Sequence, residues 1–170
     1  MKDNHSTLLA NSFVLIEIGN FKAATDTLEK LMDTLLCKPS NDNASEIVTL
    51  TQICNKIFYS GEKIEITFIQ KLNSITYRYL GSEHPINLST ELQLASMLLS
   101  QGHNDRAEKI AVELLDKCEK ILGKNDPQTV ACAMILFGLY SQKEDIASGQ
   151  ALFTRIPGLQ KAILQHLINS

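Results

Sequence analysis

Apolar residues recur at intervals of three and four along most of this chain. That spacing places them on one face of an α-helix, because an α-helix completes a turn about every 3.6 residues. The clearest stripes lie within residues 24–36, 64–79 and 107–122. Sustained alternation of apolar and polar residues is missing, as are the Asn-Gly and Asp-Gly pairs that are typical of β-hairpins. The pattern therefore predicts an all-α protein.

Turn-forming residues divide these helices into pairs. Glycine and short polar residues tolerate the backbone angles of a helix reversal, and they mark four tight turns. These turns are expected at 19–20, 60–61, 101–105 and 142–145. Longer links are expected at 39–45, 81–85 and 123–127. Short and long connections therefore alternate along the chain.

A period of 42 residues runs through this alternation. The segment LGSEHP at 80–85 recurs as LGKNDP at 122–127, a displacement of 42 residues. Gly19, Gly61 and Gly102 follow one another at intervals of 42 and 41. A repeat unit of two helices cannot bury its own apolar faces, so successive units must stack against one another. The period therefore predicts a repeat architecture.

The stretch from residue 80 to residue 127 resembles the tetratricopeptide repeat (TPR), in the 42-residue form found in kinesin light chains. The matching features are the Leu-Gly-x-x-His-Pro link at 80–85, the Leu94-Ala95 pair, Gly102, Ala107 and the closing Lys-Ile-Leu-Gly at 120–123. The resemblance implies an all-α, right-handed solenoid of about four helix-turn-helix repeats in one domain, 1–170. The repeats are expected at 5–38, 44–81, 85–123 and 127–156. A capping helix with a polar outer face is expected at 158–169.

The other repeats have the same spacing of turns and helices as this stretch, but fewer of its characteristic residues. In the first repeat, Asn11 and Ser12 stand where Leu94 and Ala95 align. In the second, Ile66 stands where a small residue is expected. In the fourth, we expect the turn to have lost a residue or two.

Small side chains let the two helices of a repeat cross closely, with bulky aliphatic residues filling the gaps on either side. The residues expected at these crossings are Ala24, Ala107 and Ala147. In the final helix, one side is expected to carry Leu159, Ile163 and Leu167.

Composition and charge argue against several classes of protein. The chain has 170 residues, of which 44% are hydrophobic and 21% charged, as in folded globular proteins. A net charge of −3 and a pI near 5.8, without a basic cluster, disfavour nucleic-acid binding. No apolar run approaches the roughly 20 residues that span a bilayer, and the first residues lack a secretory-signal pattern. We therefore expect a cytoplasmic protein without a nucleic-acid partner or membrane insertion.

The residue types that carry chemistry in enzymes and metal proteins form no recognisable constellation. No metal-ligand spacing connects the four histidines, which are His5, His84, His103 and His166. A GxSxG motif and a glycine-rich phosphate loop are both missing. No CxxC pair occurs among the cysteines, which are expected to be core thiols: Cys37, Cys54, Cys118 and Cys132. We therefore expect no catalytic residues, no cofactor and no metal.

The TPR resemblance implies a binding surface along the first helix of each repeat, because these helices line the concave face of TPR stacks. Alignment places there Gln52, Asn55 and Tyr59 of the second repeat, Leu92, Gln93, Ser96 and Ser100 of the third, and Met134, Gly138, Ser141 and Gln142 of the fourth. This wall is polar and mostly uncharged, and it suits hydrogen bonding to a peptide. It lacks the lysine and arginine with which some TPR clamps hold a terminal carboxylate. Simple exposure to water is the other interpretation of the same residues.

The expected function is therefore non-enzymatic binding of a protein or peptide partner, with the oligomeric state left open. The alternative is a small chaperone or adaptor for a secreted or regulatory protein, able to self-associate through its first repeat. A hydrolase or nucleotide enzyme on a helical scaffold would need a constellation that the sequence does not contain.

Overall fold

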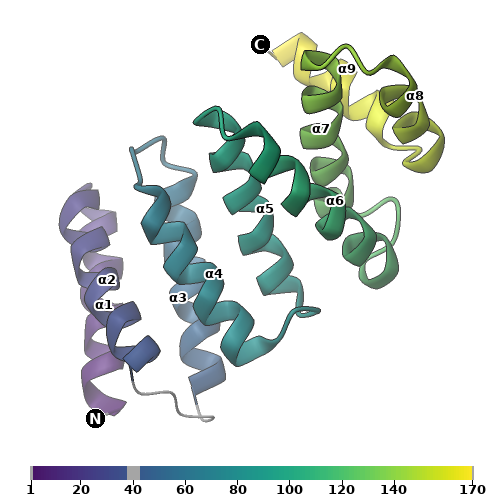
Figure 1. Ribbon diagram of the computed structural model, residues 1–170. Coiled ribbons are helices and arrows are strands. Elements are labelled where there is room, and N and C mark those ends of the chain that lie inside the picture. Colours follow the sequence, from purple (N-terminus) through teal and green to yellow (C-terminus); the bar gives the residue numbers. More distant parts are fainter. Residues whose placement is uncertain (1, 38–42, 170) are drawn as a thin grey trace. The chain divides into compact units, whose positions relative to one another are not determined.

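Nine helices account for most of residues 2–37 and 43–169, which are the residues that the computed structural model describes (Figure 1). They are α1 (Lys2–Glu17), α2 (Phe21–Cys37), α3 (Ala44–Phe58), α4 (Ile66–Leu80), α5 (Pro85–Ser100), α6 (Asn104–Ile121), α7 (Pro127–Gln142), α8 (Ile146–Arg155) and α9 (Leu159–Asn169). These described residues contain no strand, so the all-α prediction is confirmed. The link expected at 39–45 lies mostly outside the described residues.

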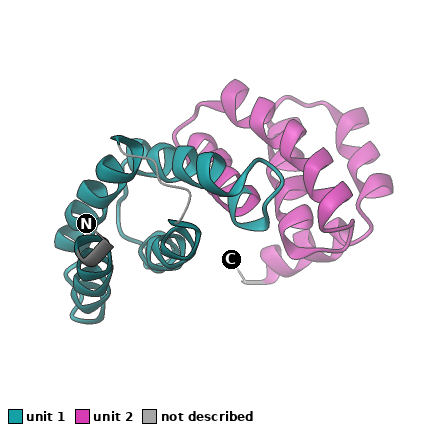
Figure 2. Cartoon of the chain, turned by 90° about the horizontal axis from the view of Figure 1, so that it is seen from below, with its two compact units in different colours: residues 1–87 teal, residues 88–170 magenta. Residues whose placement is uncertain are grey.

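The chain divides into two compact units, residues 1–87 and 88–170, with the boundary inside α5 (Figure 2). In the first unit, α1 packs against α2 and α3, and α4 packs against the same two helices. In the second unit, α7 packs against α6 and α8, and α9 packs against α7 and α8. The expected organisation as one domain remains a prediction.

In the first unit, two side chains of α4 tie down the end of α2. The hydroxyl of Tyr79 donates to the carbonyl oxygen of Leu35 at 2.8 Å, and Nη1 of Arg78 donates to that of Leu36 at 2.8 Å. The last carbonyls of a helix have no partner within the helix, so these bonds satisfy groups that would otherwise need water. The positive charge of Arg78 also suits the negative end of the α2 dipole.

Tight turns with the same hydrogen bonds connect the helices of three repeats. After α5, Gly102 has φ 77°, and its N–H donates to the carbonyl of Leu99 at 3.0 Å. The N–H of His103 donates to the carbonyl of Leu98 at 2.9 Å. This pair of bonds is a Schellman motif, which requires a left-handed residue after the helix. Gly19, also at φ 77°, takes that position after α1.

In the fourth repeat, a glutamate takes the glycine position. Glu144 has φ 56°, and its N–H donates to the carbonyl of Ser141 at 3.2 Å. The N–H of Asp145 donates to the carbonyl of Tyr140 at 2.9 Å, which completes the same motif. The expectation that this turn has lost a residue or two is therefore wrong. The turn has its full length, but its left-handed residue is not glycine.

Small residues are buried five positions after each of these turn residues. Ala24 and Ala107 are fully buried, as expected. In the fourth repeat the position belongs to Gly149, where an added Cβ would lie 3.7 Å from the Phe137 ring. Ala147 is exposed, so its expected place at the helix crossing is wrong. The unrecognised full-length turn shifted that assignment by two residues.

The 42-residue period is also visible in the links before α5 and α7. Gly81 and Gly123 begin them with φ 88° and 91°. At the ends of the links, Nδ1 of His84 and Oδ1 of Asp126 each accept a hydrogen bond from the amide two residues later, at 3.2 and 2.8 Å. A proline then follows as the first helical residue, where its missing N–H costs nothing.

Two positions in the first unit carry residues that differ from the TPR pattern, and the structure explains both. Ser12, which replaces the alanine of the third repeat, is fully buried, and its hydroxyl donates to the carbonyl of Leu8 at 2.8 Å. It therefore packs as a small residue, like the buried Ala95. In the second repeat, α4 begins only at Ile66, which is half-buried. Position 66 therefore stands at the very start of α4 rather than within the helix, where a small residue was expected.

The predicted last helix is confirmed as α9, but its predicted apolar side is only partly correct. Leu159 is fully buried and Ile163 is half-buried against the core of the second unit. Leu167, expected on the same side, is 67% exposed. The second half of α9 therefore extends beyond the helices that its first half covers.

Candidate binding groove between α1 and α3

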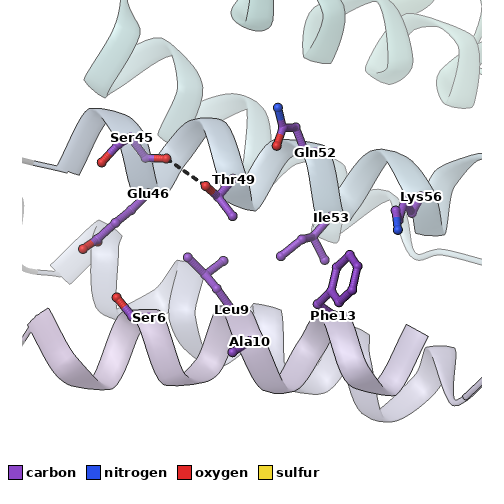
Figure 3. Close-up of a pocket in the computed structure, with 10 residues that line it drawn as sticks. All are labelled: Ser6, Leu9, Ala10, Phe13, Ser45, Glu46, Thr49, Gln52, Ile53 and Lys56. Atoms are coloured by element: carbon purple, nitrogen blue, oxygen red, sulfur yellow. Dashed lines mark hydrogen bonds between the residues drawn. The ribbon is translucent and has the colours of Figure 1, made fainter. Parts of the chain in front are cut away.

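A groove of about 540 Å³ lies between α1 and α3, the first helices of the first two repeats (Figure 3). Both helices belong to the first unit. The lining residues are Ser6, Leu9, Ala10 and Phe13 of α1, and Ser45, Glu46, Thr49, Gln52, Ile53 and Lys56 of α3. Within each helix, most of them recur at intervals of three and four, so each helix contributes one continuous face.

Apolar side chains form the floor of the groove. Leu9 and Phe13 point from α1 toward α3, and Ile53 points back toward α1 (Figure 3). Leu9 and Ile53 are buried, whereas the ring of Phe13 is exposed. The floor therefore offers an aromatic surface that an apolar side chain could cover, with release of water.

Charged side chains of opposite sign stand at the two ends. At one end, a carboxylate oxygen of Glu46 lies 2.9 Å from Nδ1 of the buried His5. At the other, Nζ of Lys56 lies 4.2 Å from the centre of the Phe13 ring and 3.0 Å from a carboxylate oxygen of Glu17. Each end thus links α1 to α3 through a polar or cation–π contact.

The ends define the length and polarity of the site. Glu46 and Lys56 are ten positions apart on α3, which corresponds to about 15 Å at the rise of an α-helix. Between them, the hydroxyl of Thr49 is already used, because it donates to the carbonyl of Ser45 at 3.1 Å. Gln52 lies on the rim and is exposed. The arrangement can hold a short peptide segment, but it contains no nucleophile paired with a base.

The buried cysteines are unreactive by their environment. Burial raises the pKa of the Cys118 thiol to about 11 and raises the pKa values of Cys54 and Cys132 further. The Cys132 thiol also donates to the carbonyl of Ala111 at 3.1 Å. Cys37 is exposed at the end of α2, so its expected place in the core is wrong. It stands in the last turn of its helix, outside the stripe that faces the core.

Among the described side chains, no three of histidine, cysteine, aspartate or glutamate converge as a metal site would require. No described helix is both long and apolar enough to cross a membrane.

The eleven residues expected on the concave face have different environments in the structure. Of these, only Gln52 lines the groove between α1 and α3. Tyr59 is exposed directly after α3, with its ring at the edge of Phe58, and Asn55 is half-buried. Gln93 is only 3% exposed, so it offers little surface to a partner.

The remaining members of the set lie in the second unit. Leu92 and Met134 are half-buried against its core, and Gly138 is half-buried. Ser96 and Ser100 are exposed on α5, and the Ser100 hydroxyl donates to its own helix. Ser141 lines a separate pocket between α7 and α8, and Gln142 accepts a hydrogen bond from Asn104 at 3.0 Å. Whether these residues share one surface with Gln52 remains a prediction.

Sequence reasoning missed the α1 side of the groove. The first repeat matched the TPR pattern poorly around Asn11 and Ser12, so no concave position was assigned to α1. A signal was nevertheless present, because α1 carries apolar residues outside its buried positions. Phe13 and Val14 of this helix are both exposed. A helix that is apolar on more than one face indicates more than one contact surface.

Comparisons with known proteins agree on the fold. No protein-family model and no curated protein sequence match the chain. A crystal structure of the nearly identical TPR-like repeats of a Podosopora anserina protein, described as a kinesin light chain, has a TM-score of 0.60 and 16% identity over 94% of this chain and 76% of that one. A variant of the same repeats has a TM-score of 0.61 and 16% identity over 95% and 76%. The chain therefore has the all-helical fold of TPR-like repeat solenoids, as the resemblance of residues 80–127 to such repeats implied.

Proposed function

We propose that the chain is a non-enzymatic binding module that holds a peptide segment of a partner protein, with the groove between α1 and α3 as its principal contact. The observation that carries the proposal is the groove itself, which has an apolar floor between two ends of opposite charge. Cavities of this size are in the range that holds ligands, roughly 300–1,000 Å³. A buried apolar anchor with a polar rim is also the usual design of a peptide site.

The charges suggest how a bound segment would be oriented. An apolar side chain of the peptide would cover the Phe13 ring and the adjacent Ile53. A basic group would lie near Glu46, and an acidic group near Lys56, about 15 Å away along α3. Such electrostatic complementarity fixes the direction of binding more than it raises affinity.

The fold supports this use of the site. Stacked helical repeats present extended concave surfaces to their partners, and the first helices of TPR repeats line that surface. We propose that Gln52, on the rim of the groove, and Tyr59, directly after α3, add polar contacts in the first unit, and that Ser96 and Ser141 provide contacts of their own in the second unit. We place this activity in the cytoplasm, a reducing compartment that suits free thiols such as Cys54 and Cys132.

A random-peptide phage library selected against the full chain tests the proposal without a known partner. Selected peptides are synthesised, and their affinities are measured by fluorescence anisotropy. Ala10→Glu adds a carboxylate to an exposed position of the groove lining, so it should weaken binding by about tenfold or more while leaving the Tm unchanged. Ala151→Glu, at an exposed position of α8, is the matched control and should bind like the wild type.

The outcomes separate the groove from the rest of the surface. Equal affinities of the wild type and Ala10→Glu would show that peptides bind elsewhere, and Ser96→Arg would then locate the contact on α5. A selection that yields no sequence-specific peptide would contradict the proposed function as a peptide-binding module.

A further inference from the structure

A second apolar pocket lies in the second unit, between α7 and α8. Its volume is about 470 Å³, and its apolar lining comes from Phe137, Tyr140, Ile146 and Phe153. The rings of Phe137 and Phe153 meet edge to face, with centroids 5.1 Å apart. Ile146, the first residue of α8, also lines the pocket. Its side chain is 71% exposed although it is aliphatic. This pocket is separate from the groove between α1 and α3.

The rim of this pocket is acidic. Glu144 and Asp145 precede α8 and line the pocket. Hydrogen bonds from Ser148 lower the pKa of Asp145, so its carboxylate is ionised at neutral pH. The neighbouring Lys143 offsets this charge only in part, because its ammonium pairs with Glu108 and lies 3.8 Å from Asp105.

The same unit carries an apolar and basic helix end that matches the pocket. Leu164, Leu167 and Ile168 of α9 are 54%, 67% and 82% exposed. Lys161 is also exposed and lies on the same side of the helix as Leu164 and Ile168, because 161, 164 and 168 are spaced by three and four residues. Within Leu159–Asn169 there is no aspartate or glutamate. The exposed end of α9 is therefore apolar with a positive charge, whereas the pocket is apolar with negative charges.

From these two surfaces we propose that two copies of this chain associate reciprocally, with the end of α9 from each copy seated in the pocket between α7 and α8 of the other. Clustered apolar side chains of this kind mark interaction surfaces in soluble proteins. Both surfaces belong to residues 88–170, so one two-fold axis can satisfy both contacts and close the assembly. Leu164, Leu167 and Ile168 cover the aromatic rings, and Lys161 approaches Glu144 and Asp145.

The oligomeric state of the full chain tests this proposal. Light scattering coupled to size-exclusion chromatography, over a wide dilution series, should show a dimer that dissociates into monomers. Leu167→Glu places a charge in the proposed contact at a position already exposed to solvent, so it should raise the dissociation constant by about tenfold or more. Ile18→Glu, at a similarly exposed position in the turn directly after α1, is the matched control and should leave the dimer intact.

A charge exchange makes the test specific for the proposed partner surfaces. Lys161→Glu and Glu144→Lys should each weaken the dimer, and the double variant should restore part of the lost affinity. A chain that stays monomeric at all concentrations overturns the proposal. So does a dimer that resists Leu167→Glu but dissociates with Ile18→Glu, because the contact would then involve the turn between α1 and α2. None of these substitutions changes a residue that lines the groove between α1 and α3. Peptide binding in the groove can therefore succeed or fail independently of dimer formation.

Discussion

The ammonium group of Lys56 lies 4.2 Å from the centre of the Phe13 ring, on the opposite wall of the groove between α1 and α3. The same ammonium pairs with Glu17 at 3.0 Å, so one side chain of α3 makes two contacts with α1. A lysine over an aromatic ring is attracted by the negative face of the ring, even when both groups remain partly in water. This contact fixes one end of the groove.

Removing this ammonium should loosen the first two repeats. Lys56→Gln is expected to lower the free energy of unfolding by about 1 kcal/mol, through loss of the cation–π contact and of an exposed ion pair. Urea denaturation followed by circular dichroism measures the change. Lys63→Gln, at an exposed position before α4, is the matched control and should change stability by less than about 0.5 kcal/mol. Equal stabilities of the two variants would contradict the predicted role of Lys56.

A second prediction tests where the helices of a repeat cross. Ala107 is fully buried, so Ala107→Leu should overpack the crossing and cost about 1 to 3 kcal/mol. Ala147 is exposed, so Ala147→Leu should be nearly neutral, within about 0.5 kcal/mol. Thermal or urea unfolding of the two variants provides the comparison. A large loss for Ala147→Leu would restore the original assignment of Ala147 to the crossing, in place of Gly149.

The small residue at the helix crossing of the fourth repeat is Gly149, whereas the sequence pattern predicted Ala147. This difference shows what the pattern could and could not locate. A search for glycine at the turn succeeds where glycine supplies the left-handed residue, as at Gly102. It fails at Glu144, because the Schellman hydrogen bonds can form around any residue that accepts a positive φ. Ser12 was not recognised as a small packing residue because the pattern requires alanine there. Its hydroxyl donates to its own helix, so the residue packs like alanine.

The candidate groove was harder to predict than the fold. Repeat phase depends on glycine, proline and apolar spacing, which can be read locally along the sequence. The groove depends instead on which faces of α1 and α3 meet, and residues about 40 apart in the sequence decide this. The pairing of His5 with Glu46 is one such contact. Hydrophobic spacing alone cannot pair those two residues.

A third prediction follows from the left-handed conformation of Glu144. A residue with a Cβ pays a steric cost there of about 1–2 kcal/mol, which glycine avoids, although glycine loses more chain entropy on folding. Glu144→Gly should therefore raise the free energy of unfolding by about 0.5–1 kcal/mol. Glu144→Ala removes the same charge without relieving the strain, so it should give no such gain. Urea denaturation at a concentration that keeps the chain monomeric measures both, and a stabilising Glu144→Ala would assign the effect to charge.

A fourth prediction concerns the thiols. In the native chain, Cys37 should react rapidly with a colorimetric disulfide reagent, because it is exposed. Cys54, Cys118 and Cys132 are buried, and only the thiolate attacks a disulfide. Burial raises the pKa of Cys118 to about 11, so raising the pH from about 7 to about 8.5 leaves this thiol protonated and does not make it reactive.

The kinetics of this reaction give the test. One of the four cysteines should react in a fast phase, and the other three only as the protein opens or when denaturant is added. Cys37→Ser should remove the fast phase and leave the slow phase unchanged. If a second thiol reacts at the fast rate in the native chain, then either the core around Cys54 or the core shared by Cys118 and Cys132 opens far more readily than their burial implies.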